Sequence, residues 1–288
     1  MICRLTLFIM GLTFIALGCA TMYNPMITQP ESWICYYGKI PRGASLKSID
    51  LAILDPDNVP NVHKYTREGT MCVGYVSIGE AEDYRFYWKK IKNEGFIIAE
   101  NADWKGNYYI DPRNERWKSV IIDEVIPRVL NCGYHGIFMD TLDTAEYLEW
   151  LDPDKYEGSI DAMVELVRDI RRRYPTIIMI SNNGYPLLSR IAQYIDAALV
   201  EDLYTAYDFA TGVYGLQDTN ITKENRQILH DISARYRVPI LTLDYVHPDD
   251  STTKLSIERK SKDNGFFPYI ADINLEVLPR QVKQEGNR

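Results

Sequence analysis

Eight short apolar runs recur along the chain, and helix-like segments separate them. Each run is short and dominated by apolar residues, as in strands that are buried on both faces. Strands that alternate with helical segments form parallel sheets with helical crossovers. The runs are WICYYG (33–38), LAILD (51–55), MCVGYVSIGE (71–80), HGIFMD (135–140), TIIMISNN (176–183), AALVEDLY (197–204), PILTLDYV (239–246) and FFPYIAD (266–272).

The intervening segments carry apolar residues at helical spacing. This spacing predicts helices over residues 160–174, over 223–237 with Thr222 as a cap, and over 253–265, which ends at a glycine. The segment 116–133 contains a proline, so we expect a kink or a break there. Eight strand–helix repeats favour an α/β fold of the closed (β/α)8 TIM-barrel type. An open doubly wound sheet is the alternative.

The N-terminal sequence MICRLTLFIMGLTFIALGC predicts export. Its apolar run, Leu5 to Leu17, is too short to cross a bilayer comfortably and fits the core of a signal peptide. Small residues directly before Cys19 resemble a bacterial lipobox, which predicts lipidation of Cys19. An ordinary secretory signal and an uncleaved anchor are the alternatives.

These features divide the chain into three parts. Residues 1–18 are interpreted as a lipoprotein-type signal peptide, 19–32 as a tether and 33–288 as one barrel domain. The prediction is a bacterial lipoprotein that is anchored to a membrane in the periplasm or at the cell surface, or a secreted protein. We expect a monomer whose only membrane contact is the N-terminal lipid.

Composition and motifs argue against several functional classes. The formal net charge is −8 and no basic cluster is present, so the sequence gives no support for nucleic-acid binding. There is no HExxH motif, no Cys/His cluster and only four histidines, so we expect no metal. Glycine-rich phosphate motifs are absent, and we expect no cofactor. The GxSxG motif of serine hydrolases is absent too.

Acidic and amide side chains follow nearly every predicted strand. In a (β/α)8 barrel the carboxyl ends of the strands converge on one mouth, so we expect these side chains to gather there. A single Asp after a strand is usually a turn residue or a helix cap, but Glu is a poor turn former. Clustered carboxylates without a metal motif suggest general acid–base chemistry, such as glycoside hydrolysis. The strand-end residues include Asp55, Glu80, Glu82, Asp140, Asp143, Asn182, Asn183, Glu201, Asp202, Asp244 and Asp272.

Aromatic residues accompany the acids. The chain has 21 Tyr and 5 Trp, and many of them lie near predicted strand ends. Aromatic rings stack on sugar faces, and tyrosine hydroxyls bond sugar hydroxyls, although many Tyr simply pack the core. We predict substrate contacts for Tyr37, which ends a strand, and for Trp104, which lies in a polar loop. Tyr75 and Tyr204 are further candidates.

Three blocks of the sequence resemble a known family. GYVSIGEAEDYR (74–85), NADWKGNYYIDPRNERW (101–117) and GYHGIFMDTLDTAEY (133–147) are similar to signature blocks of the endo-α-1,4-polygalactosaminidases, glycoside hydrolase family 114, and of related bacterial proteins. The resemblance extends from Trp33 to Asp272. It implies a (β/α)8 barrel that acts on galactosamine-rich α-1,4-linked polysaccharide.

The resemblance also implies a catalytic Asp after the fourth strand and a catalytic Glu after the sixth. These positions are Asp140, the implied nucleophile, and Glu201, the implied general acid/base. Residue spacing alone leaves open whether the pair has the retaining or the inverting separation. Strand position and motif match add Glu80, Asn182 and Asp244 as substrate contacts. Asp143 is a further contact or a helix cap.

Three functions compete on this evidence. The leading hypothesis is an exported glycoside hydrolase that acts on a polysaccharide. The polysaccharide would be cationic if it contained deacetylated amino sugars. A non-catalytic polysaccharide-binding lipoprotein on the same barrel is the main alternative. A deacetylase or a lyase is the third, but no metal-binding His/Asp set is evident for deacetylation.

Overall fold

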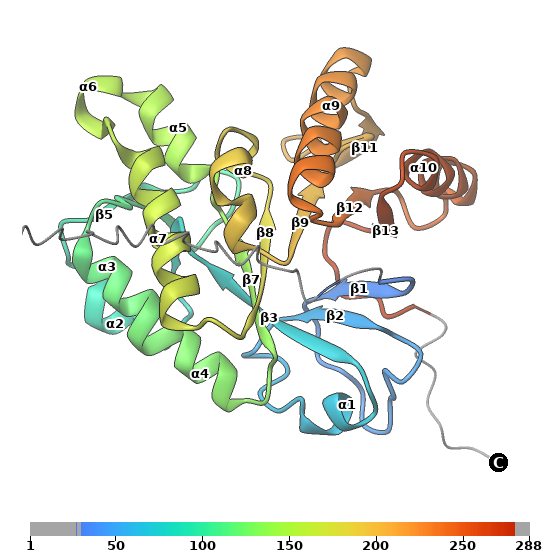
Figure 1. The fold of residues 1–288 in the computed structure, drawn as a ribbon, viewed down its shortest axis with the longest axis horizontal. Coiled ribbons are helices and arrows are strands. Elements are labelled where there is room, and N and C mark those ends of the chain that lie inside the picture. The colour runs from blue at the N-terminus through green and yellow to red at the C-terminus, as the bar shows by residue number, and fades with distance from the viewer. Residues whose placement is uncertain (1–26, 28–29, 280–288) are drawn as a thin grey trace, which may run out of the picture.

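Eight parallel strands form the core of the protein. The computed structural model describes residue 27 and residues 30–279 (Figure 1). The strands pair in the order β1 (Trp33–Tyr36), β2 (Leu51–Leu54), β3 (Met71–Ser77), β7 (Gly136–Asp140), β8 (Ile178–Asn182), β9 (Ala197–Glu201), β12 (Ile240–Tyr245) and β13 (Phe267–Ala271). All eight predicted strands are present in sequence order, and the predicted (β/α)8 barrel is confirmed.

The first and last strands lie against each other and nearly close the barrel. The Trp33 indole N–H donates to the Phe267 carbonyl at 3.1 Å, and the Tyr37 amide donates to the Leu275 carbonyl at 2.8 Å. The rings of Trp33 and Tyr269 pack with centroids 5.3 Å apart. Side chains and the segment after β13 therefore join the edges of the sheet.

Helices cover the outside of the strands. They are α1 (His63–Arg67), α2 (Trp88–Ile91), α3 (Glu115–Ser119), α4 (Ile126–Asn131), α5 (Thr144–Leu151), α6 (Pro153–Tyr156), α7 (Ser159–Arg173), α8 (Tyr185–Ile191), α9 (Thr219–Tyr236) and α10 (Ser251–Asp263). The helices predicted over 160–174, 223–237 and 253–265 correspond to α7, α9 and α10. Helix α9 begins earlier than predicted, because the Asp218 carboxylate, not Thr222, accepts the first free amides.

The proline-containing segment 116–133 continues through its proline. A π-helical turn, Val120–Val125, lies immediately before Pro127, where the missing N–H interrupts the α-helical ladder. A 3₁₀ turn, Ala192–Tyr194, follows α8.

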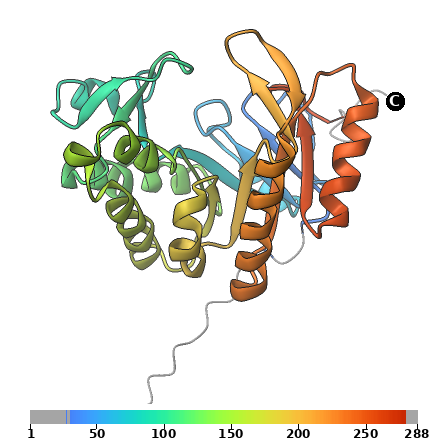
Figure 2. The same ribbon diagram turned by 90° about the horizontal axis from the view of Figure 1, so that it is seen from above.

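Two small antiparallel sheets stand over the carboxyl ends of the barrel strands, and the sequence did not predict them. One contains β4 (Glu80–Glu82), β5 (Ile97–Glu100) and β6 (Asn107–Ile110); the other pairs β10 (Thr205–Asp208) with β11 (Val213–Leu216). Figure 2 shows them rising on opposite sides of the barrel mouth. The predicted strand 71–80 is corrected, because β3 ends at Ser77 and Glu80 opens β4.

A glycine allows β7 to approach its neighbour closely. A Cβ atom at Gly136 would lie 1.9 Å from the Ile178 carbonyl oxygen, a separation that no side chain can occupy. Gly136 is the first residue of the strand that ends in Asp140, and its close pairing with β8 fixes that strand in the barrel.

The predicted signal peptide 1–18 and Cys19 lie outside the described residues. Of the predicted tether, residues 27 and 30–32 are described, and Ile27 is buried against the barrel interior. Within the described part of the chain, no helix combines the length and apolar composition that a membrane crossing requires.

Candidate active site

A cavity of about 620 Å³ lies at the carboxyl ends of the barrel strands. Eight residues that the sequence predicted line it together: Tyr37, Tyr75, Glu80, Trp104, Asp140, Asp143, Asn182 and Glu201. The lining contains seven acidic residues and two basic ones, so the cavity is strongly acidic. This charge favours a cationic ligand.

Asp140 and Glu201 face each other across one amide. The Asn182 Nδ2 atom donates to Asp140 Oδ1 and to Glu201 Oε1, each at 2.7 Å. Because Asp140 Oδ1 and Glu201 Oε1 both lie 2.7 Å from the same nitrogen, the distance between these two oxygens is at most twice 2.7 Å. This limit lies near the roughly 5–5.5 Å carboxyl separation of retaining glycosidases and below the roughly 6.5–9.5 Å of inverting ones.

The backbone turns sharply after each of these three residues. Thr141, Asn183 and Asp202 have φ angles of 62°, 46° and 52°, and they directly follow Asp140, Asn182 and Glu201. The left-handed region is uncommon for residues other than glycine, and it is most strained for β-branched Thr. The turned backbone also makes local bonds: the Thr141 amide donates to Asp140 Oδ1 at 2.8 Å, and the Glu201 amide donates to Asn183 Oδ1 at 3.0 Å.

Tyr245 holds the other oxygen of Glu201. Its hydroxyl, at the end of β12, donates to Glu201 Oε2 at 2.8 Å. Burial and then the nearby Asp140 carboxylate raise the pKa of Glu201, while the bonds from Tyr245 and Asn182 oppose the rise. A carboxyl group with a raised pKa beside a second carboxylate can act as a general acid near neutral pH.

Glu80 and Asp143 add acidic groups to the cavity wall. Glu80 is buried, its Oε1 accepts from Asn101 Nδ2 at 2.9 Å, and burial raises its pKa to about 7. Asp143 is exposed as a residue, yet desolvation of its carboxyl group and the nearby Asp140 raise its pKa to about 6. Asp143 occupies the N-cap position of α5, but its side chain makes no capping hydrogen bond.

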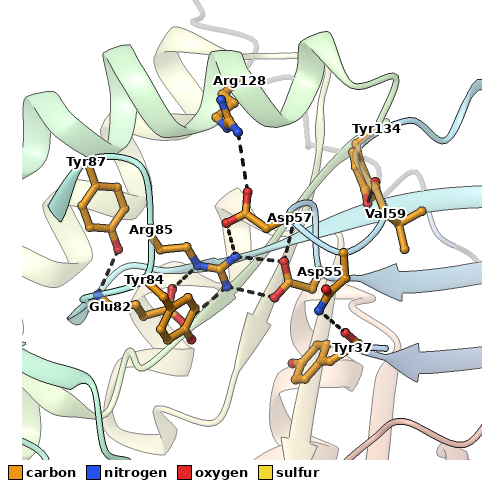
Figure 3. A network of polar contacts seen from close by, with 11 residues as sticks. Tyr37, Asp55, Asp57, Val59, Glu82, Tyr84, Arg85, Tyr87, Arg128 and Tyr134 are labelled. Atoms are coloured by element: carbon orange, nitrogen blue, oxygen red, sulfur yellow. Dashed lines mark hydrogen bonds and ion pairs between the residues drawn. The ribbon is translucent and has the colours of Figure 1, made fainter. Parts of the chain in front are cut away.

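A polar network centred on Arg85 forms one wall of the cavity (Figure 3). The Arg85 guanidinium contacts Asp55 at 2.8 Å, Asp57 at 2.9 Å and Glu82 at 2.8 Å. The Tyr84 hydroxyl donates to Glu82, and the hydroxyl of Tyr87 accepts from the Glu82 amide. One cation thus joins the end of β2 to the small sheet that begins with β4.

Two predicted substrate contacts do not line the cavity. Asp244 is fully buried, and its Oδ1 accepts the amides of Tyr204 and Thr205 at 2.7 and 3.0 Å. The chain after β9 therefore covers Asp244. Tyr204 is buried on the outside of the barrel, where its hydroxyl points to the Lys260 carbonyl at 3.5 Å. Neither residue is therefore among the predicted site residues that the cavity brings together.

Several lining residues were not among the predicted site residues. Tyr245 and Tyr207 lie near strand ends, but so many tyrosines do so in this sequence that their position did not single them out as site residues. Arg85 and Asn101 gave no signal of their own, because their roles depend on the small β4–β6 sheet. Phe209 lies at the tip of the β10–β11 hairpin, which was also not predicted.

Comparison with known proteins identifies the family. Residues 20–286 match the model of glycoside-hydrolase family GH114. The chain belongs to this family. The resemblance in the sequence blocks is therefore confirmed, and the fold and family make this GH114 protein a glycosidase.

Two relatives each match about three quarters of this chain. An uncharacterized protein of Thermotoga maritima is 29% identical over 228 residues, which cover 73% of this chain and 67% of the relative. An uncharacterized protein of Methanocaldococcus jannaschii is 29% identical over 238 residues, covering 75% and 65%. The chain thus spans about two thirds of the length of these relatives.

Two solved structures share the fold. The glycoside hydrolase domain of PelA from Pseudomonas aeruginosa aligns with a TM-score of 0.77 and 21% identity, covering 87% of this chain and 98% of that domain. Aspergillus fumigatus Ega3 in complex with galactosamine aligns with a TM-score of 0.63 and 12% identity, covering 89% and 97%.

Proposed function

We propose that this protein is an exported, endo-acting glycoside hydrolase that cleaves α-1,4-linked, galactosamine-rich polysaccharide with retention of configuration. Family GH114 membership supports glycoside hydrolysis. The observation that carries the proposal is the Asn182 amide, which holds Asp140 and Glu201 close together in an acidic cavity.

In the first step Asp140 is the nucleophile. Its Oδ1 accepts hydrogen bonds from Asn182 and Thr141, which leaves Oδ2 to attack the anomeric carbon. As the new bond forms, the glycosidic bond breaks, and Glu201 gives its proton to the departing oxygen. The raised pKa of Glu201 keeps that proton available near neutral pH.

In the second step Glu201 acts as a base. It now carries a charge, and the donors Asn182 and Tyr245 stabilise that charge on both of its oxygens. Glu201 takes a proton from water, the water oxygen bonds to the anomeric carbon, and the Asp140 ester bond breaks. Two displacements at the same carbon retain the configuration.

The charge and aromatic lining of the cavity support an amino-sugar polymer as substrate. Seven acidic residues and two basic ones line the cavity, an excess that favours a deacetylated, cationic polysaccharide. Tyr37 and Tyr75 pack edge to face at 5.1 Å beside Asp140 and supply flat surfaces for sugar rings. Cys19 lipidation would place this activity at a membrane surface.

The test is release of reducing ends from partly deacetylated α-1,4-galactosaminogalactan. The wild-type protein is expected to release oligosaccharides that initially have the α configuration. Asp140→Asn and Glu201→Gln should each reduce turnover by roughly 10³-fold or more, because each removes a group that acts in the transition state. Asp263→Asn, an exposed carboxylate at the end of α10, is the matched control.

Each possible result has a clear meaning. Near-wild-type turnover by either cavity variant would refute the catalytic pair. An initial β product would refute retention. Saturable binding of the polymer by wild type and both variants, without any cleavage, would favour the polysaccharide-binding alternative.

A further inference from the structure

We propose that Trp104 and Phe209 form an aromatic gate across the mouth of the cavity, which the interior of a polysaccharide chain must part in order to reach Asp140. This inference rests on the proposed function, since it concerns how that substrate enters. On this proposal, Trp104 and Phe209 determine whether the polysaccharide is cut near its ends or at internal bonds.

The two residues meet at the tips of two separate hairpins. Trp104 lies in the turn between β5 and β6, and Phe209 lies in the turn between β10 and β11. Figure 2 shows these hairpins on opposite sides of the mouth, with their tips approaching each other. The ring centroids are 5.2 Å apart in an edge-to-face arrangement, and both residues line the cavity.

Hydrogen bonds fasten each hairpin to its own side of the cavity. In the β5–β6 turn, the Gly106 carbonyl accepts from the Asp83 amide at 2.8 Å. In the β10–β11 hairpin, the Gln217 amide donates to the Tyr204 carbonyl at 3.1 Å, and the Tyr214 hydroxyl accepts from the Ile273 amide at 3.3 Å. In the described part of the chain, no hydrogen bond or ion pair joins one hairpin to the other. The aromatic pair is therefore the contact that closes the mouth.

A single aromatic pair makes a weak closure. An edge-to-face pair favours contact by a factor of roughly 2 to 13 at room temperature. Trp104 and Phe209 also remain 48% and 44% exposed, so parting them uncovers little additional apolar surface. The tips can thus separate without any change in the barrel.

The gate affects long and short substrates differently. An oligosaccharide has a chain end close to every bond, and a chain end can pass beneath the contact. The interior of a polymer has no nearby end, so it must pass between the tips. Once the tips close again, the bound chain cannot leave sideways and can be cut again before it dissociates.

The test uses the full-length protein with Trp104→Ala, Phe209→Ala and the double variant. The substrates are partly deacetylated α-1,4-galactosaminogalactan and short oligosaccharides made from it. Viscosity loss per reducing end reports cuts at internal positions. The controls are Trp150→Ala, an exposed Trp outside the cavity wall, and Leu216→Ala, an exposed residue on the same hairpin as Phe209.

For a gate, each single variant should increase viscosity loss per reducing end about three-fold or more, with oligosaccharide kcat/KM within about two-fold of wild type. The double variant should match the stronger single variant, because either change alone opens the same contact. An unchanged cutting pattern would overturn the proposal. The proposal would also be overturned if each single variant raised the KM for both substrates and the double variant raised it by the product of the two effects. That result would indicate two residues that stack on sugar independently.

A substrate-free measurement separates this inference from the proposed function. In a Trp88→Phe/Trp150→Phe background the remaining Trp33 and Trp117 are buried, so acrylamide quenches mainly the emission of Trp104. This quenching should increase on Phe209→Ala, because Phe209 covers part of the indole ring. Unchanged quenching would show that the gate is not closed in solution. If the wild-type protein cleaves neither substrate but Phe209→Ala still increases the quenching, the proposed function is refuted and the contact is established.

Discussion

Tyr245→Phe tests how the cavity sets the pKa of the general acid. The substitution removes one oxygen, whose proton is donated to Glu201 Oε2 at 2.8 Å. That bond stabilises the charged form of Glu201 and lowers its pKa. Without it the proton is held more tightly, so the pKa of Glu201 rises further and the acid form persists to higher pH.

The magnitude follows from the type of bond. A hydrogen bond to a charged group contributes about 1.5–3 kcal/mol, and one pKa unit corresponds to about 1.4 kcal/mol. The alkaline limb of the kcat/KM–pH profile should therefore move upward by about 1 to 2 pH units. The acidic limb should not move, because Tyr245 makes no hydrogen bond to Asp140 among the described contacts.

The control is Tyr37→Phe, which alters a tyrosine of the same cavity that makes no hydrogen bond to Glu201. Its alkaline limb should coincide with that of the wild type. If Tyr245→Phe loses activity with the alkaline limb within about 0.3 pH units of wild type, Tyr245 positions substrate and does not tune Glu201. A downward shift would refute the reasoning entirely.

Three further predictions concern stability and anchoring. Glu80→Gln should be more stable than wild type at pH 8 by up to about 3 kcal/mol. Folding raises the pKa of Glu80 to about 7, so the charged form of Glu80 opposes folding, and the gain in stability should disappear towards pH 4.5. Urea unfolding at both pH values measures this, and an equal difference at both would contradict it. Arg85→Met should destabilise the protein by about 3–5 kcal/mol, since buried Glu82 loses its cation; an unfolding midpoint that matches wild type would show that the network adds no stability. Cys19→Ser should move the protein from the membrane fraction to the soluble fraction, and an unchanged distribution would exclude lipidation at this residue.

The barrel was predictable because its strands are buried on both faces. Runs such as LAILD and HGIFMD leave no polar face, so their pattern identifies parallel strands directly. The small sheets lack this signal. The β5 and β10 strands are partly exposed and only four residues long, and they pair within hairpins whose turns resemble ordinary loops.

The candidate site was predictable where a side chain ends a strand and faces the barrel mouth, as in Asp140 and Glu201. Asp244 lies on the other face of its strand, because Leu243 pairs with Glu201 and packs in the barrel interior together with Tyr245. Asp244 instead accepts the backbone amides of Tyr204 and Thr205. A run in which nearly every residue is apolar does not reveal which alternate residues face the interior. The role of Arg85 was not predictable from the sequence, because its ion pairs with Asp55 and Glu82 depend on how β2 and the small β4–β6 sheet lie together.

The seam between β1 and β13 determines when this protein can become active during its synthesis. The Trp33–Phe267 hydrogen bond joins residues 234 positions apart. The segment that follows β13 supplies Ile273, Asn274, Leu275 and Glu276 to the cavity wall. These residues follow all eight barrel strands along the chain, so the barrel and the cavity stay incomplete until this segment has been synthesised. A chain cut short before Ile273 keeps Asp140 and Glu201 but loses one side of the site that surrounds them.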